Sequence, residues 1–83
     1  METLVGRITH YFPKVGVAVV HLMADLNNGD QIRITGAYSN FSQPVTSMQV
    51  NHQPIVSALK GQEIGVKVSQ QVREGDMVYR ISG

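Results

Sequence analysis

The fold of this chain is decided by the stretch from Val45 to Val68, which reads VTSMQVNHQPIVSALKGQEIGVKV. In its second half the apolar residues Ile64, Val66 and Val68 alternate with small or polar ones, the pattern of a half-buried strand. Its first half, up to Val50, offers a second apolar face. The linking residues are too many for a tight hairpin and too few for a packed helix. The stretch therefore predicts two strands joined by a loop that folds over one end of a β-barrel.

Six strands are predicted along the whole chain from β-branched, aromatic and alternating residues. They span residues 3–12, 15–23, 31–35, 43–50, 63–69 and 77–81. Gly6 inside the first strand predicts a bend or a close backbone approach. Because open strand edges invite aggregation, so many strands in a short chain predict an all-β, six-stranded closed β-barrel that forms one domain over residues 1–83.

Turns that contain glycine recur at residues 28–30, 60–62 and 74–76, and a strand follows each of them. Glycine adopts positive φ at little cost, and an acidic or amide residue beside it can bond to the turn backbone. The recurrence predicts one turn geometry used three times, without a true sequence repeat.

Residues 15–23 form the most apolar run of the chain, VGVAVVHLM. Its β-branched content favours a strand over a helix. An apolar run with no polar face predicts a strand that is covered on both sides. The second cover is supplied either within the monomer or by a second copy or another partner.

Composition limits the class of protein. The chain has 83 residues, 42% of them hydrophobic, and a formal net charge of +1. A strong basic excess, which is typical of non-specific nucleic-acid binders, is missing. Because the sequence contains no cysteine, we expect a reducing, cytoplasmic location and no disulfide. No apolar run reaches the roughly 18 residues of a membrane span, and the N-terminus lacks the features of a signal peptide, so we expect no membrane association.

Five segments in order carry a resemblance to one family: residues 17–22, 29–36, 45–50, 61–66 and 73–76. With them the chain resembles the second domain of the translational GTPases, the β-barrel that follows the G domain of elongation factor Tu. It is also similar to the small translation elongation factor-like proteins. The resemblance implies a barrel of the translation-factor second-domain type. A phosphate-binding Gly-x-x-x-x-Gly-Lys-[Ser/Thr] loop is missing, so GTP is not an expected ligand.

Three further signatures resemble the C-terminal barrel of collagenase-like peptidases: residues 9–12, 47–50 and 72–76. The two resemblances imply different functions. The first implies a non-catalytic, translation-associated module that contacts RNA, either a tRNA end or ribosomal RNA. The second, kept as the alternative, implies an accessory barrel that partners a separate collagenase-like, peptidase-type enzyme.

Candidate RNA-binding residues cluster in two segments that the barrel is expected to bring together at one end. They are Tyr11, Phe12, Lys14, Gln49 and His52. Aromatic rings next to cations form the usual platform for an unstacked base. A glutamate that lines the tRNA-end pocket in the elongation factor family aligns with Gln49, which keeps hydrogen bonding but not the charge. The alternative for this set is plain packing and solvation at the barrel mouth.

Candidate residues for a protein partner are Tyr38 and Phe41, because exposed aromatic rings are typical anchors of protein interfaces. A loop that folds onto the barrel explains the same two rings. Neither catalysis, a metal nor a cofactor is expected. The sequence has no Gly-x-Ser-x-Gly elbow, and His10, His21 and His52 stand singly, without the spacing of a zinc site.

Overall fold

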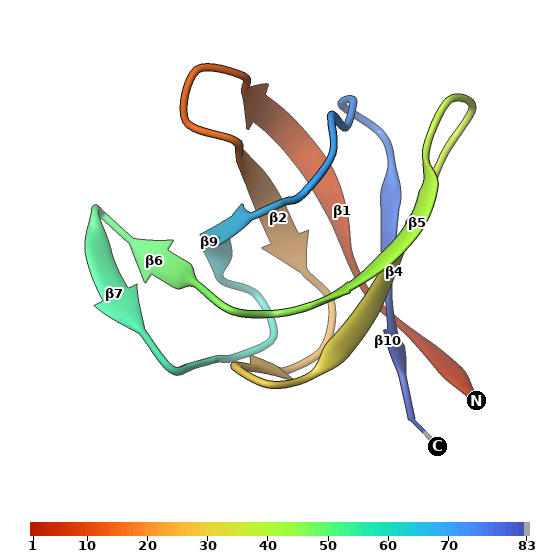
Figure 1. Cartoon of the computed structure of the whole chain (residues 1–83). Coiled ribbons are helices and arrows are strands. Elements are labelled where there is room, and N and C mark those ends of the chain that lie inside the picture. Colours follow the sequence, from red (N-terminus) through yellow and green to blue (C-terminus); the bar gives the residue numbers. More distant parts are fainter. Residues whose placement is uncertain (83) are drawn as a thin grey trace.

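The computed structural model describes residues 1–82, and Gly83, the last residue of the predicted domain, lies outside the described residues. Within residues 1–82 the chain forms ten strands and no helix (Figure 1). The strands are β1 Glu2–Phe12, β2 Val17–Leu22, β3 Leu26–Asn27, β4 Gln31–Thr35, β5 Asn40–Pro44, β6 Met48–Val50, β7 Gln53–Ile55, β8 Ser57–Ala58, β9 Glu63–Lys67 and β10 Met77–Ile81. The prediction of an all-β chain is confirmed.

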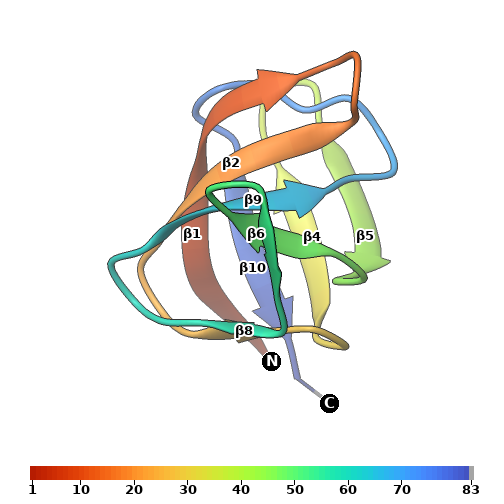
Figure 2. The same cartoon turned by 90° about the vertical axis from the view of Figure 1, so that its left-hand side faces the viewer.

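Eight strands form one antiparallel sheet in the order β5-β4-β10-β1-β2-β9-β6-β7, and β3 pairs with β8 beside it. Figures 1 and 2 show the large sheet curling around a central core. Among the described residues no ladder joins the two edge strands, β5 and β7. The closed six-stranded barrel of the sequence analysis is therefore not formed by these hydrogen bonds, although all six predicted strand regions contain strands.

The core lies inside the curl and is aliphatic. Strand alternation places one face of each strand there: Ala18, Val20 and Leu22 from β2 and Ile32 and Ile34 from β4 are buried. Each fully buried aliphatic side chain of this size contributes about 1.5–3 kcal/mol to folding by leaving water. The opposite residues of β2 point away from this core, so the fully apolar run is covered on its inner face by ordinary packing.

Strand β1 bends, and Gly6 permits the bend. The register of β1 shifts between Leu4 and Gly6 against β10. A Cβ at Gly6 would lie 2.5 Å from Val20 Cγ1 and 2.8 Å from the carbonyl oxygen of His21. Both distances are too short for any side chain, so the predicted close backbone approach is confirmed at this position.

The predicted strand 43–50 is divided in the structure. β5 ends at Pro44, Val45 docks on the turn before β4, and β6 begins at Met48. The docking consists of two hydrogen bonds: Gly29 N–H donates to the Val45 carbonyl, and Val45 N–H donates to the Asp30 carbonyl, both at 2.8 Å. These bonds turn the chain away from β4, so β6 pairs with β9 instead.

A tight hairpin follows β6, where the sequence analysis expected only a loop. Val50 pairs with Gln53, so Asn51 and His52 form a two-residue connection between β6 and β7. β7 is an edge strand, and there Pro54 is tolerated because the missing N–H does not interrupt a central ladder. The expectation failed because it counted the whole distance to β9 as one connection.

One side chain bridges the region between β5 and the end of β9. Gln43 is buried, and its Nε2 donates to the Lys67 carbonyl at 2.8 Å. Ser69 N–H donates to the Gln43 Oε1 at 2.7 Å. The amide thus supplies the donor and acceptor that a neighbouring strand would otherwise supply.

The three glycine turns share one geometry, as predicted. They comprise residues 27–30, 59–62 and 73–76, and φ is 93° at each of Gly29, Gly61 and Gly75. In each turn the N–H of the fourth residue donates to the carbonyl of the first at 3.1 Å, the bond of a type II turn. The side chain of the fourth residue accepts the N–H of the first, at 2.9, 2.7 and 3.0 Å respectively.

Each of these turns also docks on another strand or segment in the same way. The glycine N–H donates to the carbonyl of Val45, Leu22 or Ile8, respectively, at 2.8–2.9 Å. The N–H of that same residue returns a bond to the carbonyl of the fourth turn residue, again at 2.8–2.9 Å. The three turns therefore fasten the ends of strands at three places with one repeated set of bonds.

The described residues include no helix that is long and apolar enough to cross a membrane. The cytoplasmic location inferred from the missing cysteines stays a prediction.

Candidate functional site

A groove of about 720 Å³ lies on the outer face of β2, β9 and β6, the face that Figure 2 presents to the viewer. Its lining alternates with the core residues of the same strands. Val17 and Val19 from β2, Gly65 from β9 and Gln49 from β6 form its floor. The groove explains the second face of the apolar run 15–23, because Val17 and Val19 are half-buried here.

Two apolar residues at the connection of β1 to β2 line the groove as well, one at the end of β1 and one in the turn that follows. Phe12 and Val15 are 47% and 55% exposed, which is high for large apolar side chains. Across from the floor stands the hairpin tip, which we define as Asn51 and His52. The groove therefore combines an apolar floor with exposed apolar side chains and a polar hairpin tip.

Gly65 makes the middle of the floor flat. A Cβ at this position would lie 3.1 Å from both Val17 Cγ1 and Gln49 Cγ. Its φ is not in the left-handed region, so backbone conformation does not require glycine here. The side chains of Val17 and Gln49 therefore close over Gly65, and any larger residue at this position would have to displace them.

Two opposite charges mark the ends of the groove. Glu63 and Lys67 flank Gly65 at two residues on either side, on the same face of β9. Their Cα atoms are four steps along the strand apart, which is about 13 Å. Glu63 Oε2 accepts a hydrogen bond from Thr9 Oγ1 at 3.4 Å. Lys67 Nζ donates to the Val15 carbonyl at 2.8 Å, so the position of Lys67 is held by the turn between β1 and β2, while the contact of Glu63 is long and weak.

The hairpin tip has an unusual backbone. Asn51 has a φ of 51° and His52 a φ of 64°, as a two-residue hairpin with the native twist requires. Asparagine adopts this region readily, whereas the second position of such a turn strongly favours glycine. Histidine at position 52 therefore holds an energetically unfavourable backbone conformation at the edge of the groove.

The structure brings together three of the five predicted RNA-binding residues. Phe12, Gln49 and His52 all line the groove. Tyr11 packs partly buried against the core. Lys14 is exposed in the turn between β1 and β2 and is not part of the lining.

The two residues predicted for a protein partner lie in different environments. Tyr38 is 78% exposed, and the Arg73 guanidinium lies 4.3 Å from its ring centroid. Phe41 is only 9% exposed, because alternation along β5 turns its ring into the core. The expectation of two exposed aromatic rings is therefore wrong for Phe41.

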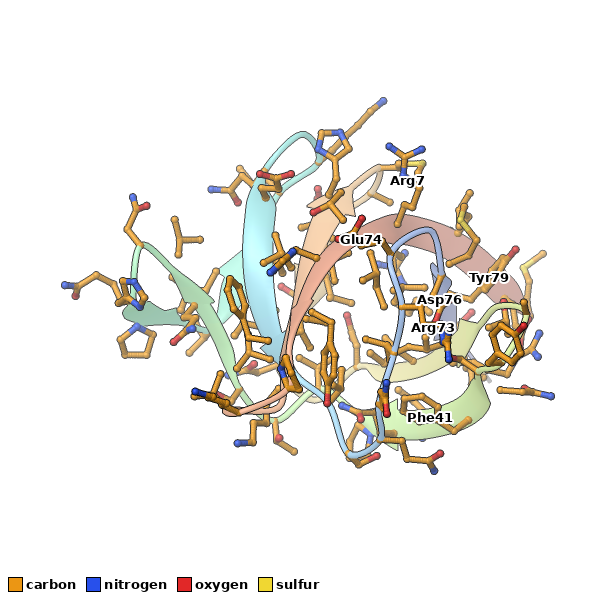
Figure 3. The ribbon with its side chains drawn as sticks, turned by 90° about the horizontal axis from the view of Figure 1, so that it is seen from above. Arg7, Phe41, Arg73, Glu74, Asp76 and Tyr79 are labelled. Carbon is orange, nitrogen blue, oxygen red and sulfur yellow. The ribbon has the colours of Figure 1, made fainter. Side chains whose placement is uncertain are left out.

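A buried carboxylate supports the loop that carries Tyr38. Asp76 is 4% exposed, and its Oδ2 accepts hydrogen bonds from Ser39 Oγ at 2.6 Å and from Arg73 N–H at 3.0 Å. Figure 3 shows Arg73 and Asp76 side by side. A Cβ at Gly36 would lie 1.9 Å from Asp76 Oδ1, so only glycine fits against the carboxylate. The loop and the last glycine turn thus form one unit.

The chemistry of these sites suits binding. Within residues 1–82 no three or more His, Cys, Asp or Glu side chains converge in a way that could hold a metal ion. His10 Nδ1 lies 3.4 Å from Glu74 Oε2 in an exposed pair, and the His10 ring meets the ring of Phe12 edge-on with 4.4 Å between centroids, without itself lining the groove. The groove itself offers apolar surface, an amide and two opposite charges.

Sequence reasoning missed the residues that define the groove on β9. Glu63, Gly65 and Lys67 share one face, and the alternation of apolar residues between them already indicated this. The signal could not show that Val17 and Val19 lie beside that face, because the pairing of β2 with β9 joins segments far apart in the sequence.

The chain that forms this groove is similar in sequence to several named proteins. The chain matches a segment of peptidase-type proteins. It is 43% identical over 76 residues to an uncharacterised protease of Methanocaldococcus jannaschii, covering 90% of this chain and 19% of that protein. It is 36% identical over 81 residues to a collagenase of Porphyromonas gingivalis, covering 95% of this chain and 22% of the collagenase. The chain thus spans about a fifth of the length of these relatives, and no family model matches it.

Solved structures show the same fold. A crystal structure of the C-terminal domain of a candidate U32 peptidase from Geobacillus thermoleovorans superposes with a TM-score of 0.89 at 21% identity, covering 95% of this chain and 92% of that one. The selenomethionine variant of the same domain gives a TM-score of 0.87 at 22% identity, covering 92% of this chain and 96% of that one. The resemblance to collagenase-like peptidases is therefore supported, whereas the resemblance to elongation factor Tu is a loose likeness of fold.

These findings overturn the first function expected from the sequence. A translation-associated module that binds RNA or the ribosome is wrong, because the relatives are peptidase-type proteins. The geometry gives a physical reason for the error. The predicted RNA platform does not form as a unit, since Tyr11 turns toward the core, and the groove contains the carboxylate of Glu63, which repels phosphate.

Proposed function

We propose that this chain is a non-catalytic accessory domain that works with a peptidase-type catalytic unit. The observation that carries the proposal is the extent of the similarity: nearly the whole chain matches, yet it corresponds to only 19–22% of the length of the curated relatives. The solved C-terminal domain supports it, because the same fold occurs there as a domain of a peptidase-type protein. An apolar groove with two opposite charges agrees with a binding role.

For the contact with the catalytic unit we propose the surface around Tyr38. Its ring is exposed and stacks on Arg73, and aromatic and arginine side chains dominate the binding energy of protein interfaces. The buried hydrogen bond that Ser39 Oγ donates to Asp76 holds the loop in place, which reduces the entropy lost on binding. Phe41 supports this loop from the core side and does not contact the partner in this proposal.

We also infer that the curled sheet acts as a barrel whose closure depends on Gln43. The support for this inference is its pair of bonds to the Lys67 carbonyl and the Ser69 N–H. Such closure would keep β9, and with it the floor of the groove, at a fixed distance from β5.

An exchange experiment tests the accessory role. The segment of the Porphyromonas gingivalis collagenase that matches this chain is deleted, or replaced by this chain, and hydrolysis of gelatin is measured. We expect the deletion to lower hydrolysis and the replacement to restore it, while this chain alone hydrolyses nothing. Gelatin hydrolysis by the purified chain would refute the non-catalytic role, and a replacement no better than the deletion would refute the accessory role.

The contact surface has its own variant. In the exchanged protein Tyr38→Ala should reduce the restored hydrolysis, because it removes the exposed ring and leaves the core untouched. Ser42→Ala, at an exposed position of neighbouring β5, is the matched control and should restore as the unchanged chain does. Equal activity of the two variants would place the contact elsewhere.

A further inference from the structure

We propose that the groove binds an extended polypeptide segment with a basic side chain over Glu63, a small aliphatic side chain over Gly65 and an acidic side chain over Lys67. The inference rests on the proposed function in taking the ligand to be a polypeptide, and it names the part of the domain that receives it. It adds a second binding surface, separate from the one around Tyr38.

The spacing of the groove matches an extended chain. Glu63, Gly65 and Lys67 follow one another at intervals of two residues on one face of β9, so an anion, an uncharged position and a cation are spaced at twice the rise of a strand. A bound strand presents every second side chain to one side with the same rise, about 3.3 Å per residue. A five-residue segment therefore places its first, third and fifth side chains over these three positions.

The middle of the groove accepts an aliphatic side chain. At Gly65 the floor is formed by the apolar side chain of Val17 and the aliphatic part of Gln49, and Val19 lies beside them. Phe12 and Val15 stay about half exposed in the free chain. A bound aliphatic group would cover all of these surfaces, and removing apolar surface from water favours binding.

One charged end is arranged before the ligand arrives. Lys67 donates to the Val15 carbonyl at 2.8 Å, whereas the exposed Glu63 has only a long contact of 3.4 Å with Thr9 Oγ1. Positions fixed in advance lower the entropic cost of association. Opposite charges at the two ends select a ligand with one charge of each sign.

The same features disfavour other occupants. A second copy of the chain would present the same recessed floor, and two concave faces cannot meet between Phe12 on one side and the hairpin tip on the other. A nucleic acid carries only negative charges along its backbone, and Glu63 would repel them.

A peptide titration tests the inference on the 83-residue chain alone. Three capped pentapeptides, KTVTE, KTVTK and ETVTE, are titrated and followed by amide NMR shifts in β9 and the hairpin tip. We expect KTVTE to bind about three- to fivefold more tightly than either like-charged peptide, the range of an exposed ion pair. In Lys67→Glu, which has two carboxylates at the groove ends, KTVTK should become the preferred ligand. Raising the salt concentration should narrow these differences.

A second variant tests the floor. Gly65→Val pushes a branched side chain against Val17 and Gln49, which raises the floor, and it should abolish binding of all three peptides. Thr35→Val adds a valine at a half-buried position of β4, away from the groove, and should bind as the unchanged chain does. If Gly65→Val does not fold, Lys67→Glu alone decides the question, because Lys67 is exposed and the substitution reverses its charge and removes one hydrogen bond to the Val15 carbonyl without touching the core.

Several results would overturn the inference. They are equal binding of the three peptides, no binding of any, an unchanged preference in Lys67→Glu, and self-association that Gly65→Val abolishes, which would make a second copy the occupant. A chain that restores collagenase activity but binds no peptide would overturn this inference and leave the accessory role standing. If the chain binds the peptides but does not restore collagenase activity, the accessory role is overturned and the peptide-binding groove stands.

Discussion

Apart from Gly16, with a φ of 66° in the turn between β1 and β2, left-handed backbone occurs in two kinds of turn that treat the side chain differently. In the three repeated turns φ is 93° and the residue is glycine, at positions 29, 61 and 75. In the hairpin tip φ is 51° and 64°, and the residues are Asn51 and His52. A Cβ added to any of the three glycines would meet nothing within 4 Å, so only the backbone conformation requires glycine there.

The hairpin tip shows the opposite choice. An L-residue in the left-handed region costs about 1–2 kcal/mol, less for asparagine, and glycine would remove most of that cost at position 52. The chain keeps a histidine at this position, and its side chain lines the groove. The three repeated turns thus carry the conformationally cheapest residue, whereas the hairpin tip keeps side chains at a cost in stability. The turn between β1 and β2 also borders the groove through Val15, but glycine stands at its left-handed position, Gly16.

The largest effect on the free energy of unfolding is expected in the last of the repeated turns, because its fourth residue, Asp76, is buried. Asp76→Ala should lower the free energy of unfolding by about 2–3 kcal/mol, because it leaves the buried Ser39 hydroxyl and the Arg73 N–H without their acceptor. Asp30→Ala removes the equivalent acceptor from a more exposed turn and should cost about 1 kcal/mol. Urea unfolding measures both. Equal losses would mean that burial does not distinguish the two turns.

A smaller effect is expected from side chains at the turn glycines themselves. Gly29→Ala and Gly75→Ala should each lower the free energy of unfolding by about 1–2 kcal/mol, because both impose the same left-handed conformation on alanine. Gly29→Asn should lower it less, since asparagine tolerates positive φ. Thermal unfolding of the three variants checks the order. If Gly29→Ala and Gly75→Ala lower the free energy of unfolding by amounts that differ by more than about 1–2 kcal/mol, packing and not φ determines the loss.

At the hairpin tip we expect a substitution that raises, and does not lower, the free energy of unfolding. His52→Gly is expected to raise the free energy of unfolding by up to about 1 kcal/mol, because glycine adopts the left-handed conformation without strain. The gain is limited because glycine also increases the entropy of the unfolded chain. The melting temperature is the measurement, and Gln53→Gly, one residue later in β7, is the control that should destabilise. A lower melting temperature of His52→Gly would remove the contrast between the two kinds of turn.

The smallest effect is expected far from both, at an exposed ion pair. Arg33 donates to both carboxylate oxygens of Glu2 at 2.6 Å, and these hydrogen bonds lower the pKa of Glu2 and raise the pKa of Arg33. A lowered pKa in the folded state stabilises the fold above the ordinary glutamate range, and the gain is lost as the pH falls through the lowered pKa. Stability measured between neutral and acidic pH should fall slightly less in Glu2→Gln. Identical pH profiles would mean that solvent screens the pair completely.

Strand positions were readable from the sequence because alternation repeats over several residues. Residues 31–35 and 77–81 were predicted with the bounds that the structure has. β3, β7 and β8 have only two or three residues, too few to show a period. Phe41 was misplaced because its strand begins inside the segment that was predicted as a polar loop.

The candidate site was readable only in part, since its components come from separate strands. Phe12, Gln49 and His52 were singled out for their chemistry, and the structure does bring them to one groove. The order of strands in the sheet decides which faces adjoin, and no local pattern encodes that order. The function was misassigned for a related reason: a shared barrel-like fold hosts unrelated functions, and the residues of a site, not the fold, determine which one applies.

The bridge made by Gln43 has a consequence for motion. Two hydrogen bonds of one side chain join β5 to the segment after β9, and a rotation of that side chain can break both without unfolding any strand. Local openings of this kind have free energies well below that of global unfolding. The Ser69 amide hydrogen should therefore exchange with solvent faster than the amide hydrogens of β2 and β9. The sheet can open locally here, between β5 and the segment after β9, while the hydrogen bonds between its strands stay intact.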